Sequence, residues 1–168
     1  MRLLPLTLRP LTADDEAQAL LADEEFAGTG FDFLMRGEDE SWRQYLSRLD
    51  NESKGVNLAP GRVPATFLGA FVAQELVGRV SIRHSLNEFL FNDGGHIGYA
   101  VRPRFRRRGY AADILRQALH YAYTLEIERI LLTCDETNLG SRKVIESCGG
   151  VYENTLVSGS RHTRRYCI

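Results

Sequence analysis

Residues 98–115 read GYAVRPRFRRRGYAADIL, and the rest of the chain can be interpreted outward from them. A strand is expected to end at Val101, Pro103 stops it, and an alanine-led helix follows Gly109. A helix N-terminus exposes unbonded N–H groups and carries about half a positive charge. A glycine there lets a phosphate reach the backbone, and nearby arginines add charge-assisted hydrogen bonds. The segment therefore predicts a cradle for a diphosphate.

Periodicity and turn residues on either side predict a strand, two helices, and then strands mixed with helices. The expected strands are residues 3–9, 66–73, 76–84, 96–101, 129–134, 151–157 and 161–168. The expected helices are residues 12–26, 39–50, 111–125 and 138–148. In the second helix, Trp42, Tyr45, Leu46 and Leu49 share one face. No internal repeat interrupts this order, which predicts one α/β domain around a central sheet.

Composition and charge narrow the class of ligand. The chain has 168 residues, of which 43% are hydrophobic and 26% charged, as in an ordinary globular domain. The net charge is −1, yet five arginines fall between Arg102 and Arg108. A nearly neutral protein with a local cationic patch suits a small anionic ligand better than a long nucleic acid. We therefore expect no nucleic-acid partner.

The cysteines bear on compartment and metal binding. Cys134, Cys148 and Cys167 are odd in number, widely spaced, and form no metal-ligand motif. This usage fits a reducing compartment. The first residues do not read as a signal peptide, and no run reaches the roughly 18 apolar residues of a membrane helix. We expect a cytoplasmic protein without a metal site or a membrane partner.

Two segments resemble motifs of the GNAT superfamily of N-acetyltransferases. Residues 98–115 are similar to the family's cofactor-binding motif, and residues 137–150, TNLGSRKVIESCGG, to its next motif. The resemblance extends from about residue 67 to the C-terminus. It implies an α/β (α+β) fold: a mixed, mostly antiparallel central sheet, about four flanking helices, and splayed strands at the cofactor site. It also implies a single domain, residues 1–168, with a variable substrate-side region to about residue 65 and a cofactor-binding core from about residue 66.

The same resemblance implies acetyl-CoA as the cofactor and assigns residues to it. The backbone of Val101 would pair with the pantetheine arm as if the arm were an added strand. Asn138 and Ser141 would lie along that arm or near the thioester. The pyrophosphate would be bound by the residues that open the helix, which are Arg106, Arg107, Arg108, Gly109, Tyr110 and Ala111.

The sequence departs from the family pattern in two places. Many members carry a tyrosine that protonates the leaving thiolate, and Ile145 stands at that position here. Ser141, Tyr99 or a water would then serve as donor, or the thiolate would leave unassisted. Many members also place a glutamate where this chain has His96, whose imidazole suits a general base near neutral pH. We therefore predict His96 and Ser141 as catalytic, whereas Cys134 is expected to be a buried strand residue.

The resemblance implies an N-acetyltransferase in which an amine attacks the thioester directly, with the Val101 N–H facing the developing oxyanion. The acceptor would be a small-molecule or peptide amine, and a homodimer is compatible with the family. Two alternatives remain at this point. One is a CoA-binding sensor that lacks catalytic activity, which the residue at position 145 supports. The other is a nucleic-acid-binding module that uses the arginine run.

Overall fold

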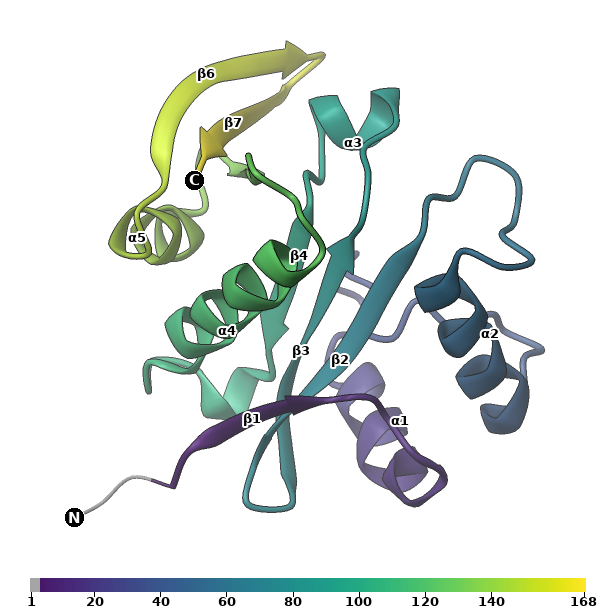
Figure 1. Cartoon of the computed structure of the whole chain (residues 1–168). Coiled ribbons are helices and arrows are strands. Elements are labelled where there is room, and N and C mark those ends of the chain that lie inside the picture. Colours follow the sequence, from purple (N-terminus) through teal and green to yellow (C-terminus); the bar gives the residue numbers. More distant parts are fainter. Residues whose placement is uncertain (1–3) are drawn as a thin grey trace.

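The computed structural model describes residues 4–168 and contains two antiparallel sheets with helices packed against them (Figure 1). The first sheet has the order β1-β2-β3-β4. Its strands are β1 (Leu6–Arg9), β2 (Ala65–Val72), β3 (Glu75–Arg83) and β4 (Ile97–Val101). These strands match the predicted ones to within a few residues, although Leu3, at the start of the expected first strand, lies outside the described residues.

The second sheet has the order β5-β7-β6 and comes from the last third of the chain. Its strands are β5 (Leu131–Asp135), β6 (Val151–Ser158) and β7 (Arg161–Cys167). An isolated bridge between Gly95 and Leu132 joins the two sheets. Beyond this bridge, β4 forms the edge of one sheet and β5 the edge of the other. The expected mostly antiparallel sheet with splayed strands is confirmed, and the splay divides it in two.

In the described part of the chain, five α-helices complete the fold: α1 (Glu16–Glu24), α2 (Trp42–Lys54), α3 (Glu88–Asn92), α4 (Tyr110–Thr124) and α5 (Leu139–Ser147). Short 3-10 turns at Ala13–Asp15 and Pro103–Phe105 precede α1 and α4. The second helix begins three residues later than predicted because Ser41 caps it. The Ser41 hydroxyl accepts from the Gln44 N–H (3.2 Å), and the Gln44 side chain accepts from the Ser41 N–H (2.9 Å). The short helix α3 was not predicted.

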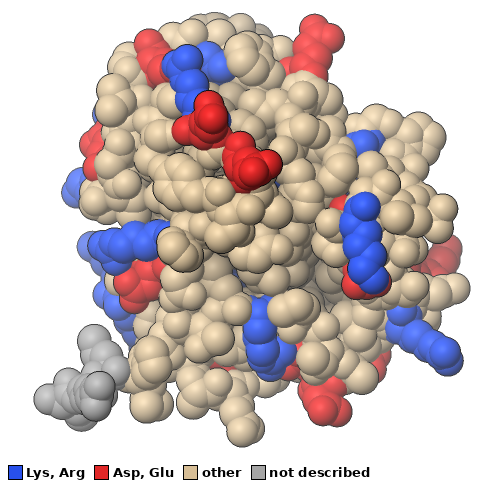
Figure 2. All heavy atoms as spheres, in the orientation of Figure 1, with Lys and Arg blue, Asp and Glu red and all other residues tan. Residues whose placement is uncertain are grey.

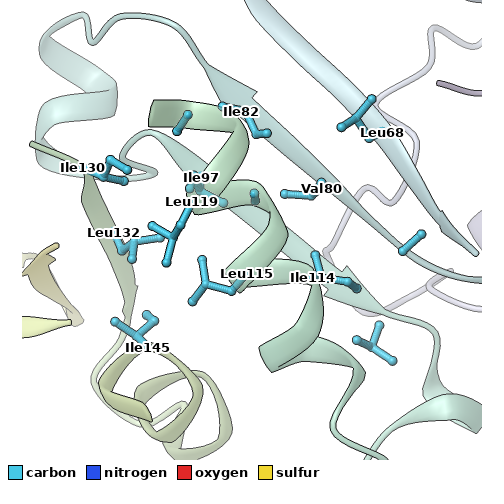
Figure 3. Packing of buried hydrophobic residues seen from close by; sticks show 14 of the residues in the cluster. Leu68, Val80, Ile82, Ile97, Ile114, Leu115, Leu119, Ile130, Leu132 and Ile145 are labelled. Atoms are coloured by element: carbon cyan, nitrogen blue, oxygen red, sulfur yellow. The ribbon is translucent and has the colours of Figure 1, made fainter. Parts of the chain in front are cut away.

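Apolar residues of β2 and β3 alternate between two cores. Side chains such as Val80 and Ile82 pack under α4, whose Ile114 and Leu115 are fully buried (Figure 3). Phe67 and its neighbours on the other face pack against α1 and α2. On that side the Trp42 indole donates to Thr12 O (3.1 Å) and the Tyr45 hydroxyl to Leu34 O (2.7 Å). This confirms the apolar face predicted for α2.

A buried ion pair ties the end of α1 to the loop that follows β4. Arg102 is 1% exposed, and its Nη2 and Nε donate to the two carboxylate oxygens of Glu25 at 2.6 and 2.9 Å. Its Nη1 donates to Leu76 O (2.7 Å). The guanidinium also lowers the pKa of Glu25. Since leaving a buried cation without its anion is costly, Glu25 keeps the start of this loop in place.

The Glu25→Ala variant should lose about 3 kcal/mol of unfolding free energy, because Arg102 would remain buried without its anion. Denaturant unfolding near neutral pH measures the loss. The matched control is Glu75→Ala, which removes a pair between Glu75 and Arg104 whose two side chains are more than half exposed (3.2 Å). Exposed pairs contribute less than about 1 kcal/mol. Equal losses in the two variants would contradict the role given to Glu25.

Candidate functional site

The predicted cradle lies at the start of α4, directly after the loop that follows β4. Gly109 is the N-cap of α4, is solvent-exposed, and has a left-handed backbone (φ 85°). A Cβ built there would meet no atom within 4 Å, so the backbone faces open space. No side chain caps this helix, so its first N–H groups remain able to bind a ligand. The residues present therefore fit a diphosphate.

The arginine run has two different roles. Arg102 is buried by its pair with Glu25, so it does not belong to the surface cation patch predicted from the sequence. Arg106, Arg107 and Arg108 are exposed, and within residues 4–168 none of them forms a salt bridge. Arg107 also has a left-handed backbone (φ 62°), which tightens the turn before Gly109. Three cations without acidic partners thus stand beside the open helix end.

Val101 presents its backbone toward the gap between the sheets. The Arg102 N–H donates to Val77 O of β3 (2.9 Å). Because backbone groups of successive strand residues alternate in direction, the N–H and C=O of Val101 point to the outer edge of β4. The Arg106 Nε donates to that carbonyl (3.2 Å), which links the strand end to the cradle. The arrangement is compatible with an arm that pairs with β4.

Tyr99, two residues earlier on β4, meets the start of α5. Its hydroxyl lies 3.0 Å from Ser141 Oγ. Burial raises the pKa of Tyr99 to about 12, and the hydrogen bond to Ser141 opposes this rise. The phenol therefore keeps its proton at neutral pH. Asn138 caps α5 by accepting from the Ser141 N–H at 3.1 Å, which fixes the position of Ser141.

Position 145 and Cys134 both belong to the core. Ile145 is fully buried and lies near Leu132 under α4 (Figure 3). The Cys134 thiol is buried on β5, and burial raises its pKa, so it is a poor nucleophile. The prediction that Cys134 is a buried strand residue is confirmed.

His96 lies before β4, at the junction of the two sheets. The ring Nδ1 of His96 accepts from the Leu131 N–H (2.9 Å), and the backbone N–H of His96 donates to Leu131 O (2.8 Å). Burial, helped by the Arg83 charge, lowers its pKa. A neutral ring that accepts at Nδ1 carries its proton on Nε2 and has no free lone pair for an amine proton. The geometry thus argues against the predicted general-base role and favours a structural one.

A hollow of about 720 Å³ lies between α2 and α4, over the end of the sheet formed by β1 and β2. Its walls are mostly apolar, and Figure 2 shows uncharged residues over most of the middle of this face. Neither the cradle nor Tyr99, Ser141 or His96 contributes to it. The predicted cofactor site is therefore separate from this hollow.

In the part of the chain that the structure describes, no helix is long and apolar enough to cross a membrane. In residues 4–168 there is also no group of three or more His, Cys, Asp or Glu side chains arranged around a possible metal ion.

Comparison with known structures shows the fold. RimJ from Mycobacterium smegmatis, solved in complex with CoA-disulfide, aligns with 97% of this chain and 81% of its own at a TM-score of 0.72 and 24% identity. Spermidine N-acetyltransferase from Vibrio cholerae, solved with CoA and spermine, aligns with 97% of this chain and 94% of its own at a TM-score of 0.66 and 22% identity.

Comparison of sequences shows the family. A curated relative, the uncharacterized N-acetyltransferase YjdG of Bacillus subtilis (strain 168), is 35% identical over 54 residues. The matching stretch covers 32% of this chain and 32% of the relative. The model of the acetyltransferase (GNAT) domain matches residues 5–151, which is most of the chain. The geometry of the cradle, the fold and this match agree: the chain belongs to the GNAT family of acetyl-CoA-dependent acetyltransferases.

Proposed function

We propose that this protein transfers an acetyl group from acetyl-CoA to an amine by direct attack, within a single domain spanning residues 1–168. The observation that carries the proposal is the open, glycine-started N-terminus of α4 beside three exposed arginines that have no acidic partner among residues 4–168. Residues 66–168 would hold the cofactor, and residues 1–65 would form much of the acceptor side. The acceptor is a small-molecule or peptide amine.

Each part of the site binds or orients one part of the cofactor. The N–H groups from Arg107 to Ala111 and the Arg106 guanidinium bind the pyrophosphate. The outward N–H and C=O groups of β4 near Val101 align the arm. When bound, acetyl-CoA supplies a thioester carbonyl carbon that a neutral amine can attack, and the proton that the amine nitrogen loses as the amide forms passes to water. The Val101 N–H points to the same edge and is the donor we assign to the developing oxyanion.

Tyr99 and Ser141 replace the tyrosine that many GNAT members carry at the position of Ile145. The two hydroxyls are 3.0 Å apart, and Tyr99, whose pKa is raised to about 12, is protonated at neutral pH. We assign to this pair the protonation of the departing sulfur, with the proton replaced from solvent. A thiol has a pKa near 8.5, so its thiolate needs only modest assistance.

The alternative functions have less support. The nucleic-acid module loses part of its cationic surface, because Arg102 is buried against Glu25 and Arg104 pairs with Glu75. The hypothesis of an inactive CoA sensor was based on the absence of a tyrosine at position 145. The Tyr99–Ser141 pair offers a proton donor in place of that tyrosine. Thiol release from acetyl-CoA in the presence of a broad amine panel tests the proposal directly. Binding of acetyl-CoA without turnover on any amine would favour the sensor instead.

The Gly109→Asn variant should lose the melting-temperature rise that acetyl-CoA produces in the wild type. Asparagine tolerates the left-handed backbone, so the main effect is a side chain that fills the cradle. We expect acetyl-CoA affinity to fall by about tenfold or more, since several backbone contacts would be blocked. The matched control is Gly159→Asn, another left-handed glycine facing open space (φ 59°), in the β6–β7 turn. If Gly109→Asn kept the full rise, the cradle would not be the cofactor site.

The Tyr99→Phe variant should lower kcat by about 100-fold, as the loss of a general acid does, while acetyl-CoA affinity stays within about threefold. Ser141→Ala should show a similar loss, and the double variant little more, because the two hydroxyls act as one unit. Tyr152→Phe is the matched control, since its hydroxyl pairs with Thr155 Oγ (2.9 Å) on the exposed strand β6. Unchanged kcat in Tyr99→Phe, or losses that simply add, would remove this pair from the mechanism.

A further inference from the structure

Arg83, at the end of β3, is a largely buried cation with no acidic partner in residues 4–168. Its Nη1 donates to two backbone carbonyls, Gly94 O (3.2 Å) and Gly95 O (3.5 Å). Its Nε and Nη2 form no hydrogen bond to the described residues, yet neither is sealed from solvent. The acid nearest in sequence to these carbonyls, Asp93, is already paired with Arg161 (2.6 Å). The Nε and Nη2 groups of Arg83 are thus available to a ligand.

A second guanidinium lies deeper on the same face of β3. Arg79 is 4% exposed and donates only to backbone carbonyls: Phe33 O (2.9 Å), Asp32 O (3.1 Å) and Gly98 O (3.3 Å). Burial lowers the pKa of Arg79 and that of Arg83 to about 10 each, and the Arg83 charge contributes to the shift at Arg79. The two cations repel each other in a poorly solvated place, and the charges of Asp32 and Asp23 offset only part of the effect of burial on the pKa of Arg79. An anion bound here would relieve this cost.

The Arg79 and Arg83 guanidiniums lie against β4, the strand that carries the proposed thioester site. A Cβ built on Gly98 would come within 3.0 Å of Arg83 Nη1, and Arg79 donates to the Gly98 carbonyl. Gly98 directly precedes Tyr99, whose side chain packs with the core under α4. Because strand side chains alternate, the two guanidiniums lie on the opposite face of β4, on the side of the sheet that α1, α2 and the segment around Phe33 cover. That face is where an acceptor can reach β4 without crossing the α4 core.

We infer that the acceptor amine carries a carboxylate or a similar anionic group, and that Arg83 binds this group through Nε and Nη2. The inference rests on the proposed acetyl transfer and specifies its substrate class. Paired guanidinium N–H groups match the two oxygens of a carboxylate, and such charge-assisted bonds are strong. A polyamine, by contrast, would bring further positive charge to a site where Arg79 and Arg83 already place two cations. Arg83 is thus a specificity residue of the acceptor site.

The test compares amines that differ in one anionic group. One kind of pair is a free amino acid and its amide, and another is an ω-amino acid and an alkylamine of equal length. A third is two tetrapeptides that carry either Asp or Asn in the first two positions. Spermidine is included to represent the polyamines. We expect the anionic member of at least one pair to have a kcat/KM about tenfold higher or more.

In Arg83→Gln this preference for the anionic member should disappear, mainly through a higher KM, whereas Arg83→Lys should retain part of the preference. Arg43→Gln, on the exposed face of α2, is the control and should leave it unchanged.

The outcomes separate this inference from the function on which it rests. Acetylation of neutral or cationic amines with no anionic preference in any pair would overturn the inference and leave acetyl transfer intact. A preference that survives in folded Arg83→Gln would overturn the assignment of Arg83. Acetyl-CoA binding without turnover on any member would overturn the proposed function, and this inference with it. The wild-type comparison decides the substrate class even if Arg83→Gln fails to fold.

Discussion

The conversion of β4 into α4 within eight residues is the constraint on which the cofactor site depends. The chain must leave a strand edge, turn sharply and begin a helix whose first N–H groups face solvent. Two left-handed residues, Arg107 and Gly109, make this turn possible. The left-handed region is costly for most residues and free for glycine, so glycine at position 109 lets this turn form without strain and leaves the backbone open.

Arginine serves three purposes in this fold, and its partners tell them apart. Arg102 has a carboxylate partner and works as a structural tie between α1 and the loop after β4. Arg106, Arg107 and Arg108 stand in solvent, where a cation without a partner has little cost and remains free to bind phosphate. Arg79 and Arg83 are held by carbonyls in a poorly solvated place, where an unpaired charge is expensive. That cost is why we connect the third group with an anionic ligand.

Local patterns made much of this architecture predictable, and tertiary contacts account for what was missed. The segment around Gly109 combines a strand end, a proline, a glycine and a helix, and these features depend on neighbouring residues alone. The helix α3 was missed because its Asn87 cap lies in a segment that reads as a polar loop. His96 was predicted to be a base because the sequence shows a histidine but not the Leu131 N–H that occupies its Nδ1. The sequence did not indicate Arg79 and Arg83 as binding residues. An arginine on a strand carries no distinguishing signal in the sequence, because only the structure shows that it has no acidic partner among the described residues.

The tie between Glu25 and Arg102 also limits how the two parts of this domain can diverge. Glu25 follows α1 in the N-terminal part of the chain, and Arg102 lies in the segment that leads into α4. A change of acceptor preference that reshapes α1 must therefore preserve an acid at the end of that helix or remove the charge at position 102 as well. The two parts are far apart in sequence, but they share one buried charge pair, so a change at either residue has to be matched at the other.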